Sequence, residues 1–428
     1  MTTAVPRART GAALVVVAFA LSTVLATVPT PIYAEYRRLE GFSSLTITLV
    51  FAAFAVGVLL ALGLGGHLSD VHGRRPLLLA AVLAQVASAA VFASTTALPG
   101  LLAARLLCGI GIGLVVPTAT AALAELLGSR PGSSHLAAST AVVANLGGLA
   151  AGPLVGVALL GVVGSPTRDP YVVLGLALAV AAVALLLVPE TRRPSRPRAS
   201  SRPRRPGAPA HARSTFWALA VAAAAAFAVL GSYAALAPRL MGEVFGATSP
   251  WVANLPVTLL FGCAALGQLA TATWSTARRL TWSAVLLGGG MALVAATALA
   301  GSLPGALVAA AVAGTGVGLS FRSAVTGVGA LAPPERRGEA LSAVLLLTYA
   351  GLTLPVVAVG LLAEAASATT TLVVLAAVVG SVVVLATAAA ARVLGNAAGS
   401  RSGVEQPGDA RHGESGRQPQ QVARTTHA

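Results

Sequence analysis

Long apolar stretches alternate with short polar ones along the whole 428-residue chain. A helix needs about 20 mostly apolar residues to cross the roughly 30 Å hydrocarbon core of a bilayer, where it satisfies its own backbone hydrogen bonds. Such stretches predict twelve helices, near residues 11–30, 44–64, 77–96, 99–121, 136–161, 171–188, 215–237, 251–273, 282–300, 304–328, 340–362 and 370–392. The pattern therefore predicts an all-α polytopic membrane protein.

Two longer polar segments interrupt this pattern. Residues 190–214 are rich in Arg, Pro and Ser and cannot bury a core, so they are expected to form a disordered cytoplasmic linker. Residues 395–428 are similarly polar and are expected to form a disordered cytoplasmic tail. The linker divides the chain into one six-helix bundle over residues 1–189 and a second over residues 215–394.

Charge is scarce and its distribution follows the loops. The chain is 56% hydrophobic and 10% charged, with a net charge of +15. The arginines gather in alternate loops, which the positive-inside rule assigns to the cytoplasm. Both termini are then cytoplasmic as well. The chain is expected to be a multi-pass protein of the plasma membrane. Attraction to anionic lipid headgroups accounts for the basic excess, so no nucleic-acid partner is expected.

The two sets of helices repeat each other. The stretch "GHLSDVHGRR" from Gly66 to Arg75 is echoed by "GQLATATWSTARR" from Gly267 to Arg279. "GIGIGL" from Gly109 is echoed by "GTGVGL" from Gly314, and each lies in the fourth predicted helix of its set. Two halves of equal polarity, related by an axis along the membrane normal, are typical of carriers that bind a solute between the halves.

Three short motifs occur in the first half of the chain. The first is a loop with Gly66, Asp70, Gly73, Arg74 and Arg75. The second is an arginine with a glycine ladder, Arg105, Gly109 and Gly113, and the third contains Gly148, Gly152, Pro153 and Gly156.

Together these motifs resemble the major facilitator superfamily, and the resemblance covers nearly the whole chain. Val71 departs from the first motif, where the family has a basic residue. The third motif resembles that of the twelve-helix drug:proton antiporter subgroup, with departures at Ser139 and Val157. The resemblance implies two pseudo-symmetric six-helix bundles and a monomer.

The resemblance implies that the loop containing Asp70 is a gate. The helix near 340–362 begins on the cytoplasmic side, so its positive N-terminal end is expected to receive the Asp70 carboxylate when the inner face is shut. Asp70→Asn should leave membrane insertion intact and lower transport sharply. The alternative is that Arg74 and Arg75 only fix the topology and Asp70 offsets their charge.

Arg105 lies inside a predicted span, where a charge is costly unless it faces water or a partner. The resemblance places it at the central cavity, as a carrier of charge near the proton or substrate path, and the alternative is that it snorkels to the outer end. Gly109 and Gly113 share its face and permit a close approach by another helix or a ligand.

The glycines of the third motif form one small-residue stripe on the fifth predicted helix, and Pro153 should bend that helix. The stripe is expected to pack on the helix near 251–273 of the other half as a hinge or sliding surface. Ordinary tight packing is the alternative.

Three further residues are candidates: Arg322, at the cytoplasmic surface or at the cavity; Tyr349, as a cavity aromatic or a packed tyrosine; and Pro355, as a kink. No Asp or Glu falls at the middle of a predicted helix, so a cavity with an arginine and no acid favours neutral or anionic solutes. No nucleotide-binding loop, catalytic constellation, metal site or cofactor motif is evident.

The sequence favours an alternating-access transporter that exports small amphipathic or drug-like molecules in exchange for protons. Its expected partners are a small-molecule substrate, protons and the lipid bilayer. An importer or facilitator of a small metabolite is the alternative, followed by a membrane enzyme or receptor without transport.

Overall fold

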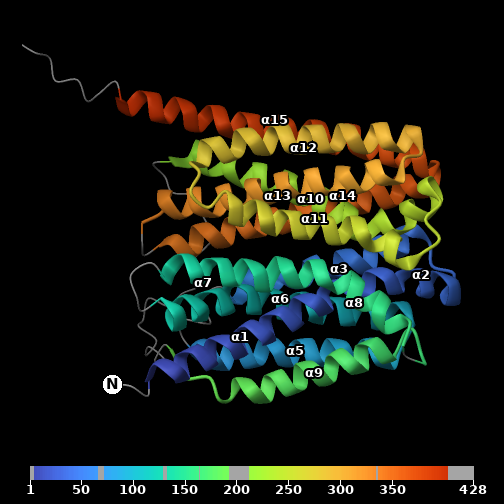
Figure 1. Cartoon of the computed structure of the whole chain (residues 1–428), viewed down its shortest axis with the longest axis horizontal. Helices are drawn as coiled ribbons and strands as arrows, with labels where there is room; N and C mark the ends of the chain where they lie inside the picture. Colours follow the sequence, from blue (N-terminus) through green and yellow to red (C-terminus); the bar gives the residue numbers. More distant parts are fainter. Residues whose placement is uncertain are drawn as a thin grey trace, which may run out of the picture.

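The computed structural model describes residues 4–65, 72–128, 133–162, 164–191, 212–333 and 336–402, all of them helical or in connecting turns. Its helices lie side by side along the long axis of the molecule, with α1–α9 in one half and α10–α15 in the other (Figure 1). We call the end at which α1 begins the terminal end and the opposite end the far end.

The described residues of the first half form eight α-helices and one short π-helical segment. They are α1 (Ala4–Thr27), α2 (Pro29–Glu40), α3 (Ser44–Gly65), α5 (Arg74–Ser94), α6 (Leu98–Leu127), α7 (Ser133–Val142), η1 (Val143–Gly147), α8 (Gly148–Leu160) and α9 (Asp169–Leu185). The segments α1–α2 and α7–η1–α8 each cross the bundle as one interrupted helix. This half therefore has six crossings.

The described part of the second half forms six uninterrupted α-helices. They are α10 (Arg213–Phe245), α11 (Pro250–Ala270), α12 (Thr276–Ala300), α13 (Leu303–Leu331), α14 (Arg337–Ala365) and α15 (Ala368–Ser402). Across the described residues, 11 helices are long and apolar enough to span a bilayer, and the apolar α9 is shorter. The predicted all-helical, twelve-crossing membrane fold is confirmed.

The first crossing is longer than predicted. It was expected to end near residue 30, but α2 continues it to Glu40 and stops at Gly41, which has a left-handed conformation with φ of 67°. Pro29 and Pro31 occupy the first turn of α2, where a missing backbone N–H costs nothing. The acidic and basic residues of this segment, expected in a loop, consequently lie on a helix.

Other boundaries also move outward. The helix predicted for 215–237 continues through Pro238 to Phe245, and α15 continues past residue 394 to Ser402. Glu190 and Thr191, assigned to the disordered linker, instead bond to the first half, as described below. Linker residues 192–211 and tail residues 403–428 lie outside the described part of the chain.

Candidate functional site

A central cavity of about 80 Å³ lies between the two halves. Its wall is mostly apolar and aromatic, and both halves contribute to it: Ala26, Thr27, Phe51, Phe54, Val58, Leu62, Ile112, Gly113, Val116, Pro117, Asn145, Leu146 and Leu149 from the first, and Phe227, Leu230, Ala234, Phe261, Phe321, Leu345, Tyr349 and Leu352 from the second. Among the described residues, no Asp, Glu, Lys or Arg lines this cavity. The wall can therefore receive apolar or aromatic groups and offers a few hydrogen-bonding atoms.

An aromatic cluster forms the wall on the side of the second half. The ring centroids of Phe227 and Phe321 are 5.1 Å apart, and Phe227 meets Tyr349 edge-on at 6.0 Å. The structure thus places the candidate Tyr349 on the cavity wall. Such edge-to-face pairs hold rings in fixed orientations.

Asn145 is a polar wall residue that the sequence analysis missed. It lies in η1, the five-residue π-helical segment in the middle of the fifth crossing. Segments of this kind often occur at functional sites because they interrupt the regular helical hydrogen bonds. A lone amide in the middle of an apolar span was the signal that could have found it.

Arg105 lies inside the first half, away from the cavity wall. Its side chain is completely buried on α6. The Nε atom donates to the Tyr33 hydroxyl at 2.8 Å, NH2 donates to the same hydroxyl, and NH1 donates to the Ala26 carbonyl at 2.7 Å. The guanidinium also lies over the rings of Phe54 and Phe92. The expected position at the cavity is therefore corrected: Arg105 ties α6 to the junction of α1 and α2.

Gly109 and Gly113 bring α6 against α3. A Cβ atom on Gly109 would lie 1.9 Å from the Phe54 carbonyl oxygen, and one on Gly113 would lie 2.6 Å from Ala61 Cβ. The partner that approaches these glycines is thus a helix of the same half, although Gly113 also borders the cavity.

The glycine stripe of the fifth crossing packs on α1 and α2. A Cβ on Gly148 or Gly152 would lie 2.0 Å from the hydroxyl of Thr23 or Thr27, and one on Gly156 would lie 2.6 Å from Pro31. The expectation that this stripe faces the other half at residues 251–273 is therefore wrong. That helix, α11, meets another face of the fifth crossing, where the Thr258 hydroxyl donates to the Ala150 carbonyl at 2.9 Å.

Pro153 explains why a hydroxyl of α1 bonds to a backbone carbonyl of the fifth crossing. It lacks the N–H that would bond the carbonyl of Leu149, four residues earlier. The Thr27 hydroxyl donates to that carbonyl at 3.0 Å, and Thr23 donates to the Ala144 carbonyl at 3.0 Å. Two threonines of α1 thus supply donors to carbonyls of the fifth crossing.

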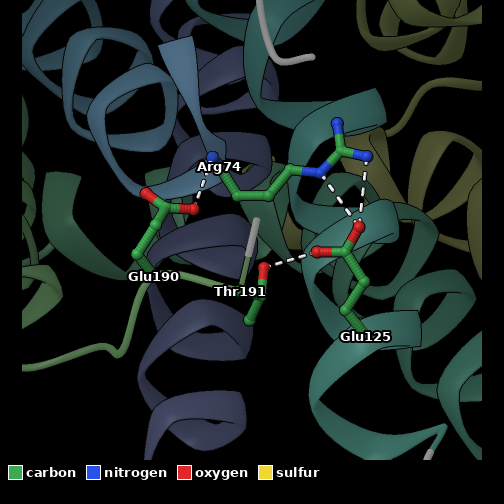
Figure 2. A network of polar contacts seen from close by, with 4 residues as sticks. All are labelled: Arg74, Glu125, Glu190 and Thr191. Atoms are coloured by element: carbon green, nitrogen blue, oxygen red, sulfur yellow. Dashed lines mark hydrogen bonds and ion pairs between the residues drawn. The ribbon is translucent and has the colours of Figure 1, made fainter. Parts of the chain in front are cut away.

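At the terminal end, a polar network joins three crossings of the first half (Figure 2). Glu190 follows α9 and accepts from the backbone N–H groups of Arg74 and Arg75, at 2.9 and 3.1 Å. The Arg74 guanidinium donates to Glu125 of α6 at 3.2 Å, and the Thr191 hydroxyl donates to the other Glu125 oxygen. The two carboxylates thereby fasten the start of α5 to α6 and to the end of α9.

Gly73 fits this network because of its conformation. Its φ is 93°, which side-chain-bearing residues rarely adopt, and a Cβ there would lie 2.8 Å from Glu190 Oε2. Gly66 and Asp70 of the same predicted gating loop lie outside the described residues, so the expected contact of Asp70 with the start of α14 stays a prediction.

The second half holds its terminal end differently. Arg279, which the repeat aligns with this region, is buried and donates to the Trp274 carbonyl at 2.6 Å and to the Thr326 hydroxyl at 2.8 Å. Arg322 is half-buried on α13, close to Arg279, and it does not line the cavity. Pro355 lies inside α14, the helix that carries Tyr349.

At the far end, hydrogen bonds join the two halves. The Leu45 backbone N–H at the start of α3 donates to Glu364 at the end of α14, at 3.0 Å. Arg239 of α10 donates to the Ser44 hydroxyl, and a Cβ on Gly360 would lie 2.2 Å from the hydroxyl of Thr48. We call these contacts the far-end lock. They must break if the halves are to separate there.

The fold and this two-half cavity can be compared with known proteins. The model of the Major Facilitator Superfamily matches residues 10–354. The chain belongs to this superfamily. The protein is accordingly a secondary transporter rather than an enzyme.

Solved structures agree with this assignment. One is the human organic anion transporter MFSD10 (TETRAN), with a TM-score of 0.68, 18% identity, and coverage of 90% of this chain and 99% of that one. Another is a bacterial homolog of the human lysosomal transporter Spinster, in an inward-facing, unoccupied conformation, with a TM-score of 0.69, 16% identity, and coverage of 90% and 97%. At these identities the likeness concerns the fold alone. No curated protein sequence matches the chain.

Proposed function

We propose that this transporter exports small amphipathic molecules in exchange for protons, by alternating access around the central cavity. The observation that carries the substrate class is the cavity wall, in which aromatic and aliphatic side chains of both halves surround a few residues with polar groups, such as Asn145 and Tyr349. Sites for small organic ligands typically have this composition.

The chemistry of the wall favours neutral and anionic compounds over cations. A cation in a low-dielectric cavity needs a carboxylate or a similar partner, and no described wall residue is acidic. Glu35 and Glu364, the acids nearest to the span interior in the sequence, are both engaged at the far end, with Arg38 and with the Leu45 N–H. Export and proton exchange are supported by the resemblance of Gly148, Gly152, Pro153 and Gly156 to the antiporter motif.

In alternating access, contacts between the two halves would break at one end of the molecule while contacts form at the other end. The far-end lock is made in this structure while the solute cavity lies deeper in the bundle. Opening the cavity towards the far end requires the loss of the Glu364 and Arg239 contacts between the halves. With the terminal end cytoplasmic, this movement would release the solute outside the cell.

Everted membrane vesicles that contain the protein provide the test. Their interior is acidified and followed with a pH-sensitive dye while neutral, anionic and cationic compounds are added in turn. We expect a neutral or anionic amphipathic compound to discharge the gradient, and empty-vector vesicles to give no response.

Two tyrosines of the second half provide matched variants. Tyr349 borders the central cavity, whereas Tyr233 borders a separate small pocket within that half. Tyr349→Ala should change the response to the active compound, and Tyr233→Ala should not. If the inserted protein gives no discharge with any compound, proton-driven export is refuted, and uptake of labelled solutes by whole cells tests import.

A further inference from the structure

A second hollow, of about 560 Å³, lies at the far end between the two halves. We call it the far-end vestibule. It is bordered by α2 and the start of α3 on one side and by the end of α10 and the start of α11 on the other. Exposed residues such as Glu243 and Thr248 stand at its edge, so it is accessible from the aqueous phase at that end. Its volume is typical of sites that enclose small organic molecules.

The two carboxylates of the vestibule already have cationic partners. Glu35 accepts from Arg38 Nε at 3.0 Å, and Glu243 accepts from Arg239 Nε at 2.7 Å. Arg38 does not itself line the vestibule. Each acid that lines the vestibule therefore already has one arginine as a hydrogen-bond partner.

Arg37 is a further cation of the vestibule. It lines the vestibule and is half-buried, and its guanidinium makes no hydrogen bond or ion pair with any residue in the described part of the chain. It lies within electrostatic reach of Arg239, Glu243 and Glu364, but none of these groups bonds its guanidinium. A guanidinium binds a carboxylate through two parallel hydrogen bonds, so Arg37 presents an anion-binding group to the vestibule.

Asn254 provides an independent sign of a ligand. It also lines the vestibule and is only 2% exposed. Its Nδ2 atom donates to the Pro250 carbonyl at 2.9 Å, which fixes the orientation of the amide, whereas the buried Oδ1 atom has no hydrogen-bond partner. A buried acceptor without a donor costs free energy, and a ligand hydroxyl or N–H would relieve that cost once a small movement of the side chain exposes Oδ1 to the vestibule.

We propose that the far-end vestibule binds small organic carboxylates that carry a hydrogen-bond donor, with the carboxylate at Arg37 and the donor at Asn254 Oδ1. The apolar portion of such a solute would lie against wall residues such as Ile47, Leu160 and Leu236. This site is separate from the central cavity, and it holds whatever the direction of transport or the coupling ion.

Mandelate is a suitable probe because it combines a carboxylate, a hydroxyl and an aromatic ring. Two analogues each lack one group: phenylacetate lacks the hydroxyl, and methyl mandelate lacks the charge. Binding of labelled mandelate is measured on the purified full-length protein in lipid nanodiscs, without a gradient, with each analogue as a competitor. We expect saturable binding and competition about tenfold weaker or more for both analogues.

Two arginines near the far end supply the matched variants. Arg37→Gln should weaken mandelate binding about tenfold or more. Arg168→Gln removes an exposed charge that does not line the vestibule, and it should change binding by less than about twofold. Asn254→Leu should abolish the preference for mandelate over phenylacetate.

The proposal is overturned if the wild-type protein binds no mandelate, if phenylacetate or methyl mandelate competes as well as mandelate, or if Arg37→Gln and Arg168→Gln have equal effects. Should Asn254→Leu not fold, the comparison of the three probes on the wild-type protein still decides. Because no gradient is used, failure of proton-coupled export in the vesicle assay leaves this result unaffected.

Discussion

Tyr33→Phe is expected to destabilise the transporter far more than a single hydroxyl suggests. The Tyr33 hydroxyl is the acceptor for two donors, Nε and NH2, of the completely buried Arg105. Phenylalanine keeps the ring and its packing but removes that acceptor. Of its hydrogen bonds to described residues, Arg105 then retains the one to the Ala26 carbonyl, at 2.7 Å.

The magnitude follows from leaving charged donors unpaired. A buried polar group without a partner costs about 1–3 kcal/mol, and more when it is charged. Hydrogen bonds between membrane helices average only about 0.6 kcal/mol, because the unfolded chain in the membrane also finds partners. Two donors of one buried guanidinium should together cost about 2–4 kcal/mol of unfolding free energy, a large part of the roughly 5–15 kcal/mol typical of a folded protein.

Tyr36→Phe is the matched control. Tyr36 lies on the same helix and is also buried, but its hydroxyl makes only a 3.4 Å contact with the Tyr171 hydroxyl. A contact of that length is weak, so its loss should cost less than about 1 kcal/mol. Unfolding free energies are measured by steric trapping in bicelles. Equal costs for the two variants would refute the reasoning, as would an unchanged cost of Tyr33→Phe in an Arg105→Met background.

Two further predictions concern the contacts between crossings. Gly152→Ala would place a Cβ 2.0 Å from the Thr27 hydroxyl and should lower the unfolding free energy by about 1–3 kcal/mol in the same assay. Gly147→Ala, whose Cβ would have its nearest contact at 3.7 Å, should leave the unfolding free energy unchanged or raise it. A larger loss for Gly147→Ala than for Gly152→Ala would contradict the packing of the stripe on α1. Glu364→Ala removes one bond of the far-end lock and should therefore make the central cavity more accessible from the far end. The reporter is Ala234→Cys, on the cavity wall, in a protein without the two native cysteines. An impermeant thiol reagent added at the far end should label this cysteine faster in the Glu364→Ala variant. Glu40→Ala is the control, because that carboxylate bonds Thr96 within one half, and equal labelling rates for the two variants would exclude a gating role for Glu364.

The sequence alone determined the number of crossings, their order and the two-fold repeat. Span length and apolar composition are local properties, and the bilayer imposes the same length on every helix. The motif residues were sufficient to suggest the superfamily, which the match over residues 10–354 then established. Boundaries were less certain where proline occurs, as at Pro29 and Pro238, since proline is compatible with the first turn of a helix and with a bent continuation.

Only the tertiary structure decided which helix each face meets. A membrane helix is apolar on nearly all sides, so its sequence pattern does not show which side faces a neighbour, the lipid or a cavity. For this reason the stripe containing Gly152 was assigned to the wrong partner, and Arg105 was expected at the cavity although Tyr33 and Ala26 satisfy it inside one half. The free acceptor of Asn254 and the unpaired guanidinium of Arg37 became visible for the same reason: whether a polar atom is satisfied depends on neighbours that are distant in the chain.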